Sequence, residues 1–251
     1  MSEVIQGIVQ GVTEFLPISS SGHIVFLERL GGFSSSNLAQ LQIGLHLGTL
    51  LSILLHYFKD IKELILSFKD NKRYISFIFV GTLPLVLTYF LFYDYIKNIH
   101  NNPDLAFQVA SYCILVTGFI LLLTKFASAN KELTFRIVLI IGFMQCLALL
   151  PGISRSGITI CSALLLGVGS KSAAKFSFLL AIPAILGAGI LDIKDIIVGD
   201  GPSYFPYLGF VVSFLVGYIS LKLLIFFTYD GKLWLFSIYC FIVGLIAIFL
   251  F

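Results

Sequence analysis

Three ionisable residues, Glu14, His23 and Arg155, interrupt apolar stretches of the sequence, and together they offer the groups that hydrolytic chemistry needs. A carboxylate accepts a proton or holds a cation, an imidazole activates a hydroxyl, and a guanidinium binds a phosphate through two parallel hydrogen bonds. Gln10 precedes Glu14 by four positions, so both side chains share one helix face. The structural alternative is that Glu14 only pairs with Arg155 and holds two segments together.

Two polar turns contain these residues. The first is Ser19-Ser20-Ser21-Gly22-His23, after Pro17, and the second is Ser154-Arg155-Ser156-Gly157, after Pro151 and just before Thr159. Each turn precedes a short apolar piece, and the free backbone N–H groups at the start of a helix attract anions. Two such turns facing one another would suit a diphosphate better than a carboxylate, which needs only one. A serine within reach of a histidine is also a standard activated nucleophile.

The composition indicates a membrane protein. Of the 251 residues, 58% are hydrophobic and only 12% are charged, whereas a soluble domain carries roughly a quarter charged residues. The net charge of +3 comes without a basic stripe interleaved with aromatics, so we expect no nucleic-acid partner. No polar linker divides the sequence, which favours one membrane domain over residues 1–251. Ionisable residues inside such a domain are costly and therefore indicate functional sites.

The apolar stretches fall into two classes. Six approach the roughly 20 residues that a transmembrane helix needs: Leu41–Phe58, Tyr74–Tyr93, Phe107–Thr124, Ala173–Ile190, Tyr207–Phe227 and Leu233–Phe251. Two more, about residues 4–30 and 137–166, are broken by the polar turns, a pattern typical of re-entrant hairpins that line a buried or wet cavity. The sequence thus predicts an all-α integral membrane protein with six transmembrane helices and two re-entrant helical hairpins. Ordinary loops at the membrane surface are the alternative.

The two broken stretches match one another. A shift of 135 residues places Gln10 on Gln145, Ile18 on Ile153, Ser19 on Ser154, Ser21 on Ser156 and Gly22 on Gly157. Three spans follow each hairpin, which gives repeat one over residues 1–124 and repeat two over residues 135–251. A hairpin returns to its own side and three spans cross an odd number of times, so the second unit starts on the opposite side. This predicts an inverted-topology repeat with a site near the membrane midplane.

The positive residues predict the orientation, because short cytoplasmic loops are enriched in Lys and Arg. Twelve fall on one side of the predicted arrangement and three on the other, with Arg155 left out because it lies in a hairpin turn. This bias places both termini outside and brings the first hairpin in from the outside. We therefore expect a multi-pass protein of the bacterial inner (cytoplasmic) membrane whose site opens to the outer face.

The two turn motifs resemble the signatures of the undecaprenyl-diphosphatase family, the bacitracin-resistance proteins. The first runs from Gln10 through Gly-Val-Thr-Glu14-Phe-Leu-Pro-Ile-Ser-Ser-Ser-Gly to His23, and the second is Pro151-Gly-Ile-Ser-Arg-Ser-Gly157. The resemblance covers the whole chain and implies removal of the terminal phosphate of undecaprenyl diphosphate, which regenerates the undecaprenyl phosphate carrier of cell-wall synthesis. It also implies a divalent cation, Mg²⁺ or Ca²⁺. The family often has Glu where this chain has Gln10, which puts a cation held by two protein carboxylates in doubt.

The resemblance also implies residue roles by motif position. The catalytic set is Glu14, Ser20, His23 and Arg155, and Glu14 is also the metal ligand. The substrate-binding set is Gln10, Ser19, Ser21, Gly22, Ser154, Ser156, Gly157 and Thr159. We expect His23 to activate Ser20 or a water beside it, and we expect no role for His46, His56 and His100.

Other functions remain open at this point. A secondary transporter or polyprenyl-phosphate flippase could use the same midplane site, since broken helices and inverted repeats are found in transporters as well. A structural membrane subunit would leave Glu14 and Arg155 unexplained. The expected partners are a polyprenyl diphosphate lipid substrate and membrane lipid, and a homo-oligomer is left open.

Overall fold

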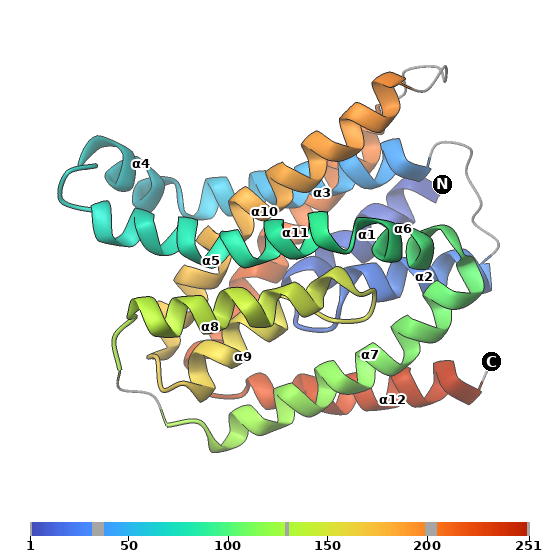
Figure 1. Cartoon of the computed structure of the whole chain (residues 1–251). Coiled ribbons are helices and arrows are strands. Elements are labelled where there is room, and N and C mark those ends of the chain that lie inside the picture. Colours follow the sequence, from blue (N-terminus) through green and yellow to red (C-terminus); the bar gives the residue numbers. More distant parts are fainter. Residues whose placement is uncertain (1, 32–37, 129–130, 199–204, 250–251) are drawn as a thin grey trace.

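The computed structural model describes residues 2–31, 38–128, 131–198 and 205–249. Within these ranges the chain is helical apart from turns (Figure 1). An isolated bridge also joins Lys131 and Val168. The α-helices are α1 Ser2–Phe15, α2 Ser20–Gly31, α3 Leu38–His56, α4 Phe58–Leu66, α5 Lys72–Leu91, α6 Tyr93–Asn101, α7 Pro103–Leu123, α8 Phe135–Gln145, α9 Arg155–Leu165, α10 Ser170–Val198, α11 Tyr207–Tyr229 and α12 Phe236–Phe249. Three short 3-10 helices are η1 Thr124–Phe126, η2 Cys146–Leu149 and η3 Leu233–Leu235.

Several of these helices can cross a membrane. Four are long and apolar enough by themselves: Lys72–Leu91, Pro103–Phe126, Ser170–Ile190 and Tyr207–Tyr229. A fifth candidate is the pair α3 and α4, which bend by 72° where they meet. The stretch Leu233–Phe249 is apolar but shorter, and the predicted end of that span at Phe251 lies outside the described residues. The prediction of a helical, multi-pass membrane protein is thus confirmed.

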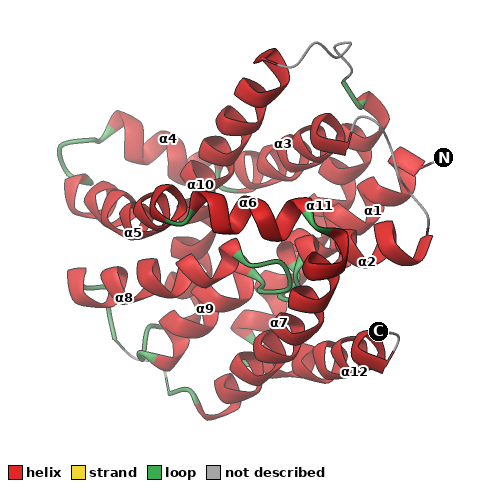
Figure 2. Ribbon diagram, turned by 45° about the vertical axis from the view of Figure 1, so that its right-hand side comes forward, coloured by secondary structure: helices red, strands yellow, loops and turns green. Residues whose placement is uncertain are grey.

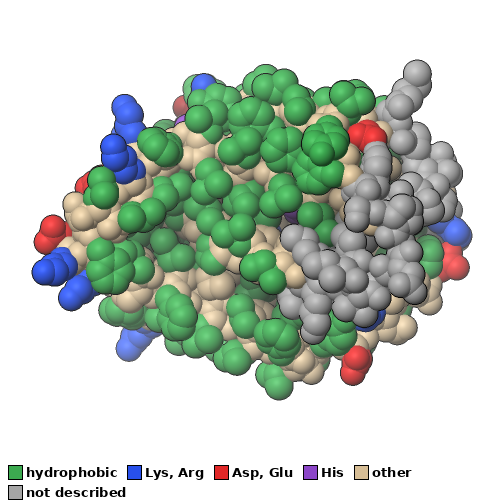
Figure 3. Space-filling view, turned by 90° about the horizontal axis from the view of Figure 1, so that it is seen from above, with side chains coloured by type: hydrophobic (Ala, Val, Ile, Leu, Met, Phe, Trp, Pro, Cys, Tyr) green, Lys and Arg blue, Asp and Glu red, His purple; other side chains and the backbone are tan. Residues whose placement is uncertain are grey.

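The outer surface is suited to lipid. Large hydrophobic side chains such as Phe79 and Ile219, 69% and 68% exposed, point away from the bundle. Figure 3 shows hydrophobic side chains over the middle of the molecule, with most of the visible Lys and Arg at the end that carries α4. The amino terminus and the carboxyl terminus both lie at the opposite end (Figure 1). A belt of this kind would be a large exposed apolar patch in water, but it is the expected surface in a bilayer.

Small residues fix the position of α1, the helix that carries Glu14. A Cβ at Gly11 would lie 2.9 Å from the backbone nitrogen of Gly217, and one at Gly7 would lie 3.0 Å from the carbonyl oxygen of Gly209. In membranes, where the hydrophobic effect does not drive helices together, small residues allow close backbone packing. Helix α1 therefore packs tightly on α11, and α11 in turn packs on α3.

The second broken stretch is anchored in a comparable way. Helix α8 packs on α5, where a Cβ at Gly142 would lie 2.6 Å from the carbonyl oxygen of Gly81. The turn before α9 is held by α7, because the Thr117 hydroxyl donates to the Gly152 carbonyl at 2.9 Å and accepts from the Ser154 N–H at 3.2 Å. Figure 2 shows loop segments inside the bundle, between α9, α7 and α2.

The two polar turns touch one another in the interior. A Cβ at Gly22 would lie 3.1 Å from the Cα of Gly152, and a Cβ at Gly157 would lie 3.2 Å from the Cβ of Pro17. The Ser156 hydroxyl donates to the carbonyl of Phe15 at 2.9 Å, which joins the start of α9 to the end of α1. The first residues of α2 and α9 and the last residues of α1 therefore surround one point.

Candidate active site

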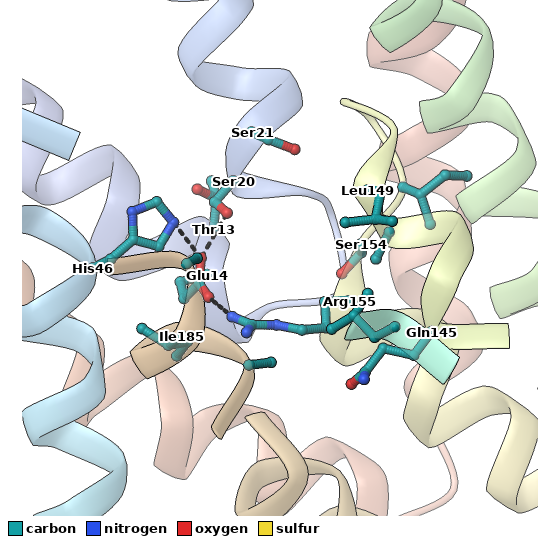
Figure 4. A pocket seen from close by; sticks show the side chains of 15 residues that line it. Thr13, Glu14, Ser20, Ser21, His46, Gln145, Leu149, Ser154, Arg155 and Ile185 are labelled. Atoms are coloured by element: carbon teal, nitrogen blue, oxygen red, sulfur yellow. Dashed lines mark hydrogen bonds and ion pairs between the residues drawn. The ribbon is translucent and has the colours of Figure 1, made fainter. Parts of the chain in front are cut away.

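A cavity of about 190 Å³ lies where the turns meet, and Figure 4 shows its lining. Helices α3, α5 and α10 complete its walls. Its polar side chains come from both turns and from α1, α3 and α8: Thr13, Glu14, Ser20, Ser21, His46, Gln145, Ser154 and Arg155. The cavity is thus a polar space inside an otherwise apolar bundle, which is the usual setting for a binding or catalytic site in a membrane protein.

Glu14, the penultimate residue of α1, lies at the centre of the polar network. Its Oε2 accepts a 2.7 Å hydrogen bond from the Ser20 hydroxyl and a 3.0 Å bond from Nε2 of Gln10. Its Oε1 is ion-paired with the guanidinium of Arg155. Glu14 is only 9% exposed, so these three donors replace the water that a carboxylate would otherwise bind.

Arg155 is the first residue of α9 and belongs to the opposite wall. Ser154 caps this helix, because its hydroxyl accepts from the Gly157 N–H at 3.1 Å. The amino-terminal end of a helix carries partial positive charge, and the guanidinium adds a full one beside it. A guanidinium has five N–H donors, and the contact with Glu14 is made by Nη2. This wall is therefore well suited to an anion.

His46 joins the site although the sequence analysis gave it no role. Its Nδ1 donates to the Gln42 carbonyl at 2.8 Å, and its Nε2 lies 3.9 Å from Oε2 of Glu14. Figure 4 shows the imidazole pointing toward Glu14 and Ser20. The signal was present in the sequence, because His46 is an ionisable residue within a predicted span, the same criterion that selected Glu14.

His23, in contrast, is not brought to this cavity. Its Nδ1 donates to the Ser19 carbonyl at 2.7 Å and its Nε2 accepts from the Tyr239 hydroxyl at 2.8 Å, with the two rings stacked 5.7 Å apart. Its ring lines a separate, apolar depression beside α12. The expected pairing of Ser20 with His23 is therefore corrected. The Ser20 hydroxyl donates to Glu14, and both ring nitrogens of His23 are engaged elsewhere.

The predicted substrate-binding residues divide into two groups. Ser21 and Ser154 line the cavity. The other six support the cavity without lining it. Gln10 donates to Glu14, Ser19 accepts from the Gly22 N–H, and Ser156 donates to the Phe15 carbonyl of α1. Thr159 donates to the Arg155 carbonyl and also bonds to Ser177, and the two glycines, Gly22 and Gly157, permit the contact between the turns. The hydroxyl groups of Ser19, Ser156 and Thr159 and the Nε2 of Gln10 are hydrogen-bonded within the fold, whereas the buried Oε1 of Gln10 has no partner among the described residues. The first role of these residues is to shape the two turns.

The position of His23 leads to a prediction. We expect His23→Ala to lower turnover about tenfold or more, because it removes the shorter of the two hydrogen bonds to the Ser19 carbonyl, at 2.7 Å, and leaves the backbone bond from the His23 N–H, at 3.3 Å, to hold the turn that presents Ser20. Tyr239→Phe keeps the bond between His23 and Ser19, so we expect it to retain at least a third of wild-type turnover. Steady-state phosphate release by the purified variants measures both. Equal losses in the two variants, or none in His23→Ala, would contradict this role.

The described residues that line the cavity allow only one kind of divalent cation site. In the described part of the chain, no three His, Cys, Asp or Glu residues are grouped so that they could hold a metal ion. Among the residues that line the cavity, Glu14 supplies the carboxylate, and Gln10 beside it is neutral. Mg²⁺ commonly takes one or two carboxylates and completes its shell with substrate phosphates and water. Glu14 fits that mode, whereas a site made wholly of protein ligands does not fit.

Comparison with known proteins shows the family to which the chain belongs. The family model described as "Bacitracin resistance protein BacA" matches residues 3–246. Undecaprenyl-diphosphatase of Halothermothrix orenii is 39% identical, covering 97% of this chain and 95% of the relative. Proteins of the same name from Methanosphaera stadtmanae and Thermosipho africanus are each 39% identical, covering 100% and 99% of this chain and 97% and 99% of the relatives. The chain therefore belongs to the BacA family of bacitracin-resistance proteins, whose model spans both polar turns and nearly every helix described above.

Proposed function

We propose that this protein is a polyprenyl-diphosphate phosphatase that hydrolyses the terminal phosphate of undecaprenyl diphosphate. The observation that carries the proposal is the cavity in which Glu14 meets Ser20 and Arg155 at the junction of two helix starts. A carboxylate bonded to a hydroxyl supplies a base and a nucleophile, and the facing guanidinium supplies a phosphate clamp. The name shared by the relatives, undecaprenyl-diphosphatase, supplies the lipid.

The proposed reaction follows from the hydrogen bonds around Glu14. The oxygen of Ser20, or of a water held beside it, forms a bond to the terminal phosphorus while its proton passes to Oε2 of Glu14. The bond from phosphorus to the bridging oxygen breaks, and the lipid phosphate leaves with that electron pair. Arg155 and the N–H groups at the start of α9 stabilise the charge on the transferred phosphoryl group. If Ser20 is the nucleophile, a water then releases inorganic phosphate from it.

A divalent cation is part of the proposal. Glu14 together with the phosphate oxygens of the substrate would hold it, and it would neutralise phosphate charge during transfer. The neutral Gln10 limits the protein's share of the ligands to one carboxylate. The cation therefore should bind weakly without substrate.

The proposed architecture is six spans and two re-entrant hairpins in an inverted repeat. Packing between the two repeats supports this architecture. Helix α1 of repeat one packs on α11 of repeat two, and α8 of repeat two packs on α5 of repeat one. The shift of 135 residues that aligns the turns maps Gly22 onto Gly157 and Pro17 onto Gly152. The contact between Gly22 and Gly152 therefore corresponds to the contact between Gly157 and Pro17. A pseudo-twofold relation between the hairpins accounts for both observations.

We also propose that the cavity opens to the outer face of the cytoplasmic membrane. The Lys- and Arg-rich end around α4 is the cytoplasmic end by the positive-inside rule. The cavity is lined by Leu85 and Ala188, which belong to the later halves of α5 and α10. Both helices run toward the opposite end of the molecule, where both termini lie (Figure 1). A substrate headgroup on the outer leaflet would thus reach the cavity by the shorter route.

Phosphate release by the purified protein tests the proposal. In detergent with Mg²⁺, we expect release from a polyprenyl diphosphate without any ion gradient, and much slower release from the matching monophosphate, which has no phosphoric anhydride bond. EDTA should lower the rate at least tenfold, and added Mg²⁺ or Ca²⁺ should restore it. No release, together with gradient-driven lipid movement in vesicles, would support a transporter or flippase instead.

A further inference from the structure

Gln145, the last residue of α8, is buried in the cavity wall with no hydrogen-bond partner. It is 0% exposed, and within the described part of the chain neither its Nε2 nor its Oε1 has a partner. Its counterpart in the other hairpin, Gln10, is equally buried but donates to Glu14. A buried amide with both ends unmet is rare in native proteins and calls for an explanation such as a ligand.

The surroundings of Gln145 indicate the charge of that ligand. Figure 4 shows it on the same side of the cavity as Ser154 and Arg155, across from His46 and Ser20. That wall carries the guanidinium and the capped start of α9, and the carboxylate of Glu14 comes from the facing wall. An amide can donate two N–H bonds or accept through its oxygen. Beside a guanidinium and a helix start, the donor end is the one that an anion would use.

We propose that Gln145 is a substrate-binding residue whose side-chain amide donates a hydrogen bond to a phosphate oxygen of the diphosphate. This inference rests on the proposed function for the identity of the substrate. Arg155 and Gln145 would hold the headgroup from one wall while Ser20 and Glu14 face its terminal phosphorus from the other. Gln145 binds the ground state and the transition state alike, so its loss acts on KM more than on kcat.

The central test is Gln145→Met, which keeps the size of the side chain and removes its hydrogen bonding. A hydrogen bond to a charged group corresponds to about a tenfold to hundredfold effect on binding. We therefore expect KM for a polyprenyl diphosphate to rise at least tenfold, with kcat within about threefold of wild type. The ligand-free protein should melt at the same temperature or higher, because an unmet buried amide is replaced by an apolar group. A lower melting temperature with unchanged KM would show a structural role and overturn the proposal.

Gln6→Met is the matched control. Gln6 lies on α1, is 2% exposed and also has an unmet Oε1, but it does not line the cavity. We expect its KM and kcat to stay within about threefold of wild type. An equal rise of KM in both variants would mean that any loss of a buried amide disturbs the bundle, and the assignment of Gln145 would fail.

Gln145→Glu separates an anion ligand from a cation ligand. A carboxylate repels phosphate, so the proposal requires KM to rise at least as far as in Gln145→Met. If Oε1 of Gln145 instead binds the divalent cation, Gln145→Glu should lower the Mg²⁺ concentration needed for half-maximal activity, and that result would overturn the proposal. This variant also serves if Gln145→Met does not fold.

A direct binding measurement tests the role of Gln145 independently of the proposed phosphatase activity. Calorimetric titration with inorganic pyrophosphate needs no turnover, and we expect binding to weaken at least tenfold in Gln145→Met but not in Gln6→Met. If wild-type protein binds pyrophosphate in this manner yet releases no phosphate from a polyprenyl diphosphate, the phosphatase assignment fails and the anion site stands. If wild-type and Gln145→Met proteins bind pyrophosphate equally, the anion site fails while the phosphatase assignment stands.

Discussion

Replacing Arg155 with alanine should reduce phosphate release from polyprenyl diphosphate by about a thousandfold. Arg155 contributes the positive charge on the anion-binding wall, and it also neutralises Glu14. Without it, the diphosphate faces an uncompensated carboxylate in a space from which water is largely excluded. Arg155→Lys should recover only part of the activity, because a lysine cannot form the planar, bidentate contact. The measurement is kcat/KM of detergent-purified variants that elute as a single species.

Arg29→Ala is the control for that experiment. Arg29 lies on α2, is ion-paired with Asp104 at 2.8 Å, and is about half exposed. Exposed pairs contribute little to stability, so we expect near-normal turnover. Turnover of Arg155→Ala within tenfold of wild type would show that the two-wall arrangement is not the catalytic centre.

The second large effect is expected for Glu14→Gln, which should lower kcat by about a hundredfold to ten-thousandfold. The amide retains the size of the side chain but cannot take the proton from Ser20 or a water, and it leaves the charge of Arg155 without a partner. Glu14 and Arg155 form one ion pair and act together. The double variant Glu14→Gln with Arg155→Ala should therefore reduce activity by far less than the product of the two single reductions. Single and double variants are compared by phosphate release under saturating substrate.

Glu28→Gln provides the matched control for Glu14→Gln. Glu28 is a partly buried carboxyl on α2 that does not line the cavity. Its conversion to the amide should leave kcat within about threefold. If Glu14→Gln turned over as fast as Glu28→Gln, the base would have to be another group, and His46 at 3.9 Å from Glu14 is the next candidate in the cavity.

The structure places His46 in the cavity, where the sequence had predicted His23, and this gives His23 a different role in the first polar turn. His23 lies in the recognised motif, yet it fixes the Ser19 carbonyl and stacks on Tyr239. Ser19 adopts φ of 71°, a conformation that non-glycine residues rarely hold without support. The bond from His23 to Ser19, together with the cap from Ser19 to Gly22, provides that support. His23 is thus placed to position Ser20 rather than to take its proton.

The sequence by itself determined the class of protein, the long apolar helices and the two breaks, but not the short helices α4 and α6. Runs of apolar residues have few structural solutions in lipid, where backbone groups must be satisfied within a helix. Helices α5, α7 and α11 accordingly begin and end within a few residues of the predicted spans. Glu14 and Arg155 could also be named in advance, because an ionisable group at membrane depth is too costly to keep without a role.

Only the tertiary structure decided which groups face the cavity. Spacing along one helix tells which side chains share a face, but it does not tell which other helix that face meets. His46 and Gln145 line the cavity because α3 and α8 pack around the turns. In the sequence, at least one other helix lies between each of them and the helix that carries Glu14. His23, three residues after Ser20, leaves the cavity because the Ser19 carbonyl and Tyr239 of α12 satisfy both of its nitrogens. Those partners are set by packing between helices, which no local pattern in the sequence records.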